Sequence, residues 1–589
     1  MTSPQARTTD YDEGMTRGPR TDLTRWTSVL AAGATVFVLA ACSNRAASNG
    51  AARRLDDLFA RWNRLDSPGC ALGVARNGRL AYERGYGAAN LDLAVPITPA
   101  SVFDVASVSK QFTAMSVVLL AGQGKLSLDD DVGKFIPDWG PRGHRVTVRH
   151  LLTHTSGLRD AFTLQGLAPE TPGGIQQKIV NILARARGFN FPPGTKFEYN
   201  NGAYALLAAI VEHVSGQPFS AFAEATLFKP LGMTHTHVHD DAARIVPNRA
   251  TGYSRAGNDF RVALRSQTDT VVGNAGVFST VGDLLRWERN LDDVQVGDPK
   301  LVAEMQTPFV ATGWSEASEY GFGVEIGRHR GLRTIGHAGG DEGRRSYVVR
   351  YPERGLAIAV LCNLDDIDPA ALARSVADSF LGDRAPESAG AAPTATAANA
   401  PSSDPVSLPP QELQSKVGLY RSLSDGSVGR IFIRDGKLMA SEDTGDSGGF
   451  ELTAVAANRF EIAGTPVVAE FVAPPGQPQE LRVSRPGSKP QVSQLIAVTF
   501  APSRAELRAF EGTYTSGEIH GTYTLRARAG GLAIEIPTRS EIALQPLFSD
   551  AFGGNIVGVA TFTRNARGQV TGFTASAPAI RGLSFERKE

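Results

Sequence analysis

The sequence has little cysteine, with only Cys42, Cys70 and Cys362 in 589 residues. Three cysteines are too few for a disulfide framework, and their spacing is not that of metal ligands, so we expect Cys70 and Cys362 to pack in a core. The chain also lacks an excess of charge of either sign, because 60 basic residues balance 60 acidic ones. We therefore expect no nucleic-acid partner.

Long hydrophobic runs are scarce, and the run from Val29 to Ala41 is too short for a comfortable membrane span. Basic residues precede it, and it ends at Leu39-Ala40-Ala41-Cys42, which resembles the lipobox of bacterial lipoproteins. We predict a signal peptide at 1–41, lipidation of Cys42 and a tether at 42–50. The protein would then be exported, periplasmic or at the cell surface, and held to a bacterial membrane by its lipid. A cleaved signal with an incidental cysteine is the alternative.

The length of the chain exceeds what one hydrophobic core usually holds, which indicates several domains. Residues 385–411 are rich in Ala, Pro, Ser and Thr and are typical of a linker. Beyond them, the run beginning at Gly418 (GLYRS) reappears at Gly512 (GTYTS), and both copies continue as alternating strands. We predict two small antiparallel β-barrel-like domains, at 412–502 and 503–589, related by duplication.

The segment before the linker, 51–384, predicts an α+β domain. Strand-like runs at its start are separated by Asn77-Gly78, a strong hairpin signal, and strand-like runs return at Ser346 to Tyr351 and Leu356 to Leu361. Helical patterns occupy the middle of the segment. We expect one antiparallel sheet, built from the two ends of the domain and flanked by helices.

Ser107 and Lys110 open a helical run whose apolar stripe extends from Val108 to Leu120. Residues three apart lie on one face of a helix, so the Ser107 hydroxyl and the Lys110 amine can meet. A serine hydroxyl becomes a strong nucleophile when a neighbouring base takes its proton. Taken alone, the motif fits equally a capping serine followed by an ordinary lysine.

Two further motifs follow in order, namely Tyr199-Asn200-Asn201 and His337-Ala338-Gly339-Gly340. With Ser107-x-x-Lys110, they resemble the three signatures of the serine β-lactamase and penicillin-binding fold. The resemblance is to the branch that contains class C β-lactamases, DD-carboxypeptidases, D-aminopeptidases and related esterases. It runs from about Leu55 to Leu381 and implies a β-lactamase/transpeptidase-like domain that needs no cofactor and no metal.

The resemblance implies a role for each motif residue. Ser107 attacks a carbonyl to form an acyl-enzyme, and Lys110 assists proton transfer. Tyr199 is the expected general base and acid, provided that adjacent cations favour its phenolate. Asn201 holds the substrate carbonyl or Lys110. The backbone N–H groups of Ser107 and Gly340 form the oxyanion hole, where glycine at 339 and 340 lets the strand approach the substrate.

His337 departs from the family pattern, because many relatives carry lysine there, a permanent cation that helps to bind a substrate carboxylate. Histidine titrates near pH 6.5 and is mostly neutral at about pH 7.5. We therefore expect weakened carboxylate recognition and poor penicillin hydrolysis, unless Arg344 or Arg345 compensates. The alternating His235, His237 and His239 could bind zinc on a strand, but the family implied by the resemblance needs no metal.

From the motifs, the expected activity is that of an exported serine hydrolase that acts through Ser107 on an amide or ester. D-amino-acid peptides of cell-wall type, such as peptidoglycan fragments, are the expected substrates. A small-ester esterase or a weak β-lactamase is the first alternative. A non-catalytic protein that binds cell-wall peptides or β-lactams is the alternative from another class, although a pure binder has no need of Ser107, Lys110 and Tyr199 together.

Overall fold

A computed structural model describes residues 53–588, apart from 172, 265–269, 315–316, 383–404, 424–425, 442–448, 463–466, 485–489, 497–499 and 538. The signal peptide, Cys42, the tether and most of the linker lie outside the described residues. The chain divides into two units, Met1–Asp57 and Leu58–Glu589, and the elements below belong to the second. Within the described ranges, no helix is both long enough and apolar enough to cross a membrane.

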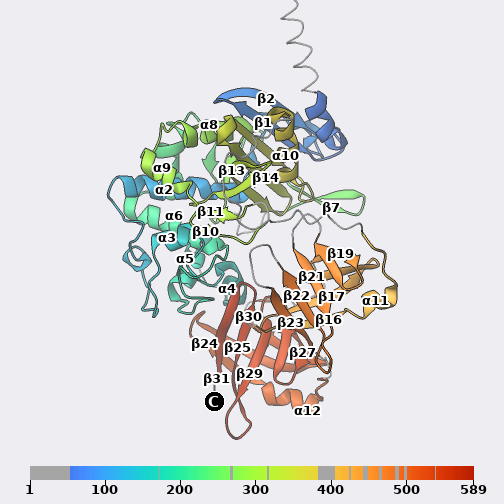
Figure 1. The fold of residues 1–589 in the computed structure, drawn as a ribbon. Coiled ribbons are helices and arrows are strands. Elements are labelled where there is room, and N and C mark those ends of the chain that lie inside the picture. Colours follow the sequence, from blue (N-terminus) through green and yellow to red (C-terminus); the bar gives the residue numbers. More distant parts are fainter. Residues whose placement is uncertain are drawn as a thin grey trace, which may run out of the picture. The chain divides into compact units, whose positions relative to one another are not determined.

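The first domain is built on an eight-stranded sheet in which every pair is antiparallel (Figure 1). In spatial order its strands are β10 Val310–Ala311, β11 Glu319–Tyr320, β12 Glu325–His329, β13 Leu332–Asp341, β14 Arg344–Tyr351, β15 Leu356–Cys362, β1 Cys70–Arg76 and β2 Arg79–Tyr86. The early hairpin β1–β2 is thus joined to the late strand β15. This confirms the predicted sheet made from the two ends of the domain.

The cysteine expectation was wrong, because Cys70 and Cys362 form a disulfide. The two residues are direct partners in the register between β1 and β15, with 4.0 Å between their Cα atoms, and both are buried. Closely opposed positions on antiparallel strands bring side chains together. Their separation of 292 residues along the chain concealed this proximity.

Helices occupy the middle of the domain, as the sequence predicts. They are α2 Lys110–Gly122, α3 Val148–Leu152, α4 Ala161–Leu167, α5 Ile175–Arg185, α6 Asn201–Ser215, α7 Phe219–Ala223, α8 Val281–Asp292, α9 Pro299–Met305 and α10 Pro369–Leu381. Helix α2 packs against α6, while α8 and α10 both contact β14 and β15. This buries β1 and β15 almost completely. A rigid sheet and a buried helix pair therefore support the segments between them.

Short strands complete the domain, at β3 Ala88–Asn90, β4 Val95–Pro96, β5 Phe103–Asp104, β6 His237–Val238, β7 Tyr253–Ala256, β8 Asp259–Val262 and β9 Val277–Ser279. Strands β5, β9 and β6 form a small sheet. Because β5 leads directly into the turn that carries Ser107, this sheet fixes the approach of the chain to that serine.

Two closed, eight-stranded antiparallel barrels follow, which confirms the predicted β domains (Figure 1). The first comprises β16 Gly418–Ser422, β17 Val428–Arg434, β18 Lys437–Ser441, β19 Phe450–Ala456, β20 Arg459–Ile462, β21 Val468–Val472, β22 Glu480–Ser484 and β23 Gln491–Ile496. The second comprises β24 Gly512–Ser516, β25 Gly521–Arg528, β26 Gly531–Glu535, β27 Ile542–Phe548, β28 Ala551–Gly554, β29 Gly558–Arg564, β30 Val570–Ala577 and β31 Ile580–Arg587. Each barrel closes by pairing its first strand with its last.

The same local hydrogen bond occurs within each of the two barrels, which supports their origin by duplication. A short helix precedes each first strand, α11 Pro410–Gln414 in one barrel and α12 Arg504–Leu507 in the other. The hydroxyl of Tyr420 donates to the carbonyl four residues earlier at 2.9 Å, and that of Tyr514 makes the same contact at 2.8 Å. Both tyrosines are buried. The tyrosine that repeats in the sequence therefore makes the same hydrogen bond in both copies.

Candidate active site

Ser107 lies in a 3₁₀ turn, Ala106–Ser109, that leads directly into α2. The preceding Ala106 has a φ of 46°, a left-handed conformation that costs a non-glycine residue about 1–3 kcal/mol. Two contacts hold the turn: Asp104 accepts a hydrogen bond from Ala106 N, and Ser109 Oγ accepts one from Val277 N, both at 3.0 Å. The serine is thus presented on a constrained turn before the helix, rather than on the helix itself as its spacing predicted.

Lys110, the first residue of α2, is fully buried. Its Nζ lies 3.0 Å from Ser107 Oγ, 2.8 Å from Asn201 Oδ1 and 2.8 Å from the carbonyl oxygen of Asn274. Burial lowers the pKa of Lys110 well below its usual value, although the negative charge of Glu325 opposes this. A neutral amine beside the serine hydroxyl can accept its proton.

Tyr199 reaches the same serine from the segment before α6. Its side chain hydrogen-bonds with that of Ser107, and its ring centroid lies 4.7 Å from Lys110 Nζ. Burial raises the pKa of Tyr199. The hydrogen bond with Ser107 lowers this pKa and the negative charge of Glu325 raises it, but burial is the largest effect, so the phenol stays protonated. This direction is opposite to the one argued from the sequence, because burial disfavours the phenolate and also disfavours the charge of the nearby Lys110.

The two asparagines after Tyr199 have different tasks. Asn200 caps α6, since its Oδ1 accepts a hydrogen bond from Ala203 N at 3.0 Å. This leaves the side chain of Asn201 to contact Lys110. Buried His154 accepts a hydrogen bond from Asn200 N at 3.0 Å through Nδ1, and its ring centroid lies 4.3 Å from that of Tyr199. Burial lowers the pKa of His154 well below its usual value, so a neutral ring supports the tyrosine.

Strand β13 forms the opposite wall and carries the third motif. A Cβ atom on Gly339 would lie 2.4 Å from the carbonyl oxygen of Val105 and 3.2 Å from Ser107 N. Glycine is therefore required for β13 to lie this close to the nucleophile turn. Gly340 follows on the same strand. The oxyanion role of the Ser107 and Gly340 N–H groups stays a prediction.

His337 is 1% exposed and lies within the wall. Its Nε2 is 2.9 Å from the Tyr320 hydroxyl, and its Nδ1 lies beside the carbonyl of Ala338 and 3.6 Å from Glu325 Oε1. Burial and the nearby Lys110 lower the pKa of His337 to about 3. The imidazole is therefore neutral at physiological pH, in keeping with the direction argued from the sequence.

Three contributors to the site had no role assigned from the sequence. Asn274 acts through its backbone carbonyl, which any residue could supply, although its surrounding run beginning at Gly273 is a recognisable motif. Tyr320 and Glu325 contact His337 from β11 and β12, which are short and follow no clear pattern. Their position relative to β13 becomes visible only through strand pairing.

The alternating histidines do not gather into a metal centre. His237 Nε2 lies 3.3 Å from His239 Nδ1, whereas His235 is exposed. Across the part of the chain that the structure describes, no group of three or more His, Cys, Asp or Glu residues is arranged to hold a metal ion.

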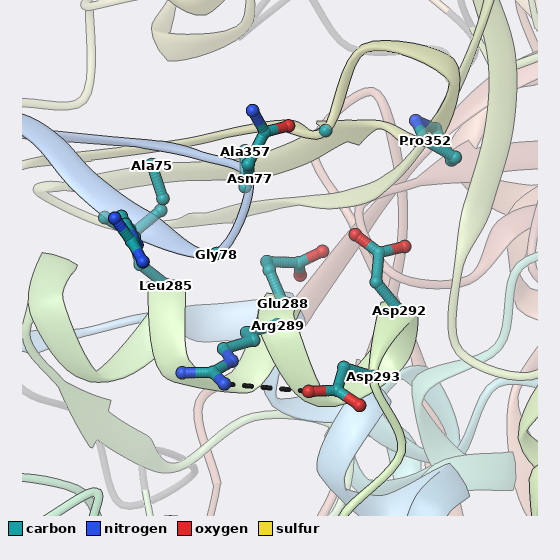
Figure 2. A pocket seen from close by; sticks show the side chains of 12 residues that line it. Ala75, Asn77, Gly78, Leu285, Glu288, Arg289, Asp292, Asp293, Pro352 and Ala357 are labelled. Carbon is teal, nitrogen blue, oxygen red and sulfur yellow. Dashed lines mark ion pairs between the residues drawn. The ribbon is translucent and has the colours of Figure 1, made fainter.

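A cavity of about 550 Å³ lies on other elements, between α8 and the turns that join β1 to β2 and β14 to β15 (Figure 2). Glu288 and Asp292 of α8 point into it, and Arg289 pairs with Asp293 at 3.6 Å. None of Ser107, Lys110 and Tyr199 lines this cavity, so we assign the chemistry to their cluster and not to the cavity.

Comparisons with known proteins show the family of the first domain. The family model described as Beta-lactamase matches residues 55–380. The D-aminopeptidase of Gluconobacter oxydans is 27% identical over 335 residues, which cover 56% of this chain and 62% of that protein. The chain thus spans less than two thirds of that relative's length.

Solved structures give the same picture. The D-amino acid amidase of Ochrobactrum anthropi SV3, complexed with L-phenylalanine, superposes with a TM-score of 0.50 at 25% identity and covers 56% of this chain and 98% of its own. The protein called SurE reaches a TM-score of 0.52 at 23% identity over 77% of this chain and 100% of its own, a likeness of fold alone.

Proposed function

The chain belongs to the Beta-lactamase family as one of its serine hydrolases, and on this premise we propose that it hydrolyses amides or short peptides of D-amino acids through a Ser107 acyl-enzyme. The observation that carries the proposal is the contact of Ser107 Oγ with both a buried amine and a protonated phenol. The names of the relatives, D-aminopeptidase and D-amino acid amidase, support the choice of substrate class.

The two flanking groups divide the proton transfers between them. As Ser107 Oγ bonds to the substrate carbonyl carbon, the neutral Lys110 amine takes the hydroxyl proton and becomes an ammonium. The Tyr199 phenol then gives its proton to the leaving nitrogen as the C–N bond breaks, and Lys110 restores the proton to Tyr199. Water attacks the ester in the second half, with the same groups working in reverse, and frees the acid and Ser107.

Export and a lipid anchor at Cys42 are part of the proposal. The Cys70–Cys362 disulfide supports export, because disulfides persist in oxidising compartments and are rare in the cytosol of most organisms. The lipobox-like run that ends at Cys42 supports the anchor. Metabolic labelling with a fatty-acid analogue should mark the wild-type protein and not Cys42→Ala.

A substrate panel tests the activity. It comprises D-amino-acid amides and their L-enantiomers, D-Ala-D-Ala peptides, p-nitrophenyl esters and a chromogenic cephalosporin. We expect turnover of D-amino-acid amides that falls to background in Ser107→Ala. Ser116→Ala is the matched control, since this buried hydroxyl of α2 donates to the Phe112 carbonyl.

A reactive fluorophosphonate separates an enzyme from a binding protein. We expect an adduct that forms on the wild-type protein and is lost in Ser107→Ala. Absence of both an adduct and turnover would favour the non-catalytic alternative, whereas an adduct with turnover of esters alone would replace the D-amino-acid proposal by an esterase.

A further inference from the structure

Glu325 places a carboxylate beside the motif strand. It is the first residue of β12, and its side chain is 13% exposed. Its Oε2 accepts a hydrogen bond from Ala338 N at 3.2 Å, and its Oε1 lies 3.6 Å from His337 Nδ1. The carboxylate therefore covers the stretch of β13 that immediately precedes Gly339 and Gly340.

In the proposed reaction, the leaving group departs near this stretch. Tyr199 supplies the proton to the leaving atom in the proposed reaction, and its ring centroid is 6.2 Å from that of His337. The charge of Glu325 also raises the pKa of both Tyr199 and Lys110, which places the carboxylate within electrostatic reach of the reacting groups. A charged leaving group would therefore interact electrostatically with the Glu325 carboxylate.

The polar groups that Ala338 and His337 offer on this stretch are already used. Ala338 N–H is bonded to Glu325, and the side chain of Ala338 is a methyl group. His337 is neutral and contacts Tyr320 and the Ala338 carbonyl through its two nitrogens. Of the two arginines considered for compensation, Arg345 donates through Nη1 to the backbone carbonyls of Asp341 and Arg344 at 2.6 and 2.7 Å, and Arg344 Nη1 lies 3.8 Å from Asp341 Oδ2.

We propose that Glu325 makes the enzyme select against substrates whose leaving group carries a carboxylate, in favour of leaving groups that are neutral or cationic. The inference rests on the proposed function, and it narrows the substrate class to simple amides, amidated peptides and basic leaving groups. Peptides that end in a free carboxylate next to the scissile bond, and β-lactams with their ring carboxylate, become poor substrates.

A matched pair of peptides tests this selection. D-Ala-D-Ala and D-Ala-D-Ala amide differ only in the charge at the leaving residue. We expect the wild-type kcat/KM to favour the amide by roughly tenfold or more, as a charge interaction in a partly buried site allows. Glu325→Gln, which keeps an oxygen acceptor for Ala338 N–H, should bring this ratio close to one by raising activity on the carboxylate substrate.

A control lies on the neighbouring strand, where Glu319 of β11 is exposed. Glu319→Gln should leave the ratio unchanged. A wild-type ratio that favours the free carboxylate, or a Glu325→Gln ratio within twofold of the wild type, would overturn the inference.

Phenyl esters keep this test separate from the proposed function. Esters of one acyl group with a plain phenyl, a meta-carboxyphenyl or a meta-(trimethylammonio)phenyl leaving group carry the same comparison without a peptide. We expect the wild-type enzyme to hydrolyse the anionic ester slowest. This comparison uses the wild-type protein alone and does not depend on the folding of a variant. If the peptides are not substrates but the esters show this order, the D-amino-acid proposal fails and the role of Glu325 stands. If the peptides are cleaved but the esters do not show this order, the D-amino-acid proposal stands and the role of Glu325 fails.

Discussion

The hydroxyl of Tyr320 lies 2.9 Å from His337 Nε2, and both side chains are buried. The pKa of His337, lowered to about 3, lies below the value of about 6.5 for an exposed histidine. The folded state therefore disfavours the imidazolium, and this contribution to stability is present above pH 6.5 and is lost as the pH falls from about 6.5 towards 3.

The His337→Gln variant tests this linkage. We expect its Tm to fall less steeply than that of the wild type between pH 6.5 and 4, because the variant has no imidazole to protonate. Exposed His235 provides the control His235→Gln, which should follow the wild-type curve. Parallel curves for all three proteins would show that His337 is not held neutral.

Lys110 should act as a base through its neutral form. Lys110→Arg keeps a cationic side chain that cannot lose its proton, so we expect kcat/KM to fall by about 10²–10⁴. The wild-type profile should rise with pH as Lys110 deprotonates, at a pH below the usual lysine value of about 10.4. Exposed Lys125 supplies the control Lys125→Arg, with activity expected near that of the wild type. Retention of activity in Lys110→Arg would show that a proton acceptor other than Lys110 serves Ser107.

The loss of activity on removing the Tyr199 hydroxyl should increase with the basicity of the leaving group. Tyr199→Phe removes the proton donor, so we expect a loss of about 10²–10⁴ in kcat on an amide, whose nitrogen must be protonated to leave. A p-nitrophenyl ester releases a stable anion and should lose much less. Tyr82→Phe, on β2, removes a hydroxyl that contacts Tyr86 and serves as the control. Equal losses on amide and ester would mean that Tyr199 does not donate to the leaving atom.

The ordered motifs of the sequence predicted which side chains lie together. Ser107, Lys110, Tyr199 and Asn201 lie in ordered motifs, and the structure brings them into contact. Their protonation did not follow from spacing, because it depends on burial. Lys110 is enclosed by segments as distant as Asn274, so the phenolate argued from a nearby cation is disfavoured in the folded protein.

Other features depend on which strands lie side by side. Strand alternation predicted an antiparallel sheet but not its register, and the register alone places Cys70 opposite Cys362. In the same way, Glu325 reaches Ala338 because β12 pairs with β13. Contacts of this kind join residues whose separation in the chain carries no signal.

The buried pair of Glu288 and Arg350 predicts a second pH dependence, at a distance from the chemistry. Glu288 is 1% exposed and points into the cavity drawn in Figure 2, and its Oε2 is 3.4 Å from Arg350 Nε. Burial raises the pKa of Glu288 to about 8, even though Arg350 opposes this. The folded state thus holds a proton that the unfolded chain releases near pH 4.5, and stability falls as the pH rises from about 4.5 to 8.

Glu288→Gln keeps the shape of the side chain and removes its titration. We expect its Tm to decline less than that of the wild type between pH 5 and 8.5, with its advantage largest at the upper end. Glu304→Gln, on α9, is the control, because Glu304 pairs with Arg149 in a part-exposed ion pair. A Glu288→Gln variant that is less stable than the wild type at pH 8.5 would contradict the prediction. It would show that the carboxylate is ionised in the fold and that its attraction to Arg350 exceeds the cost of its burial.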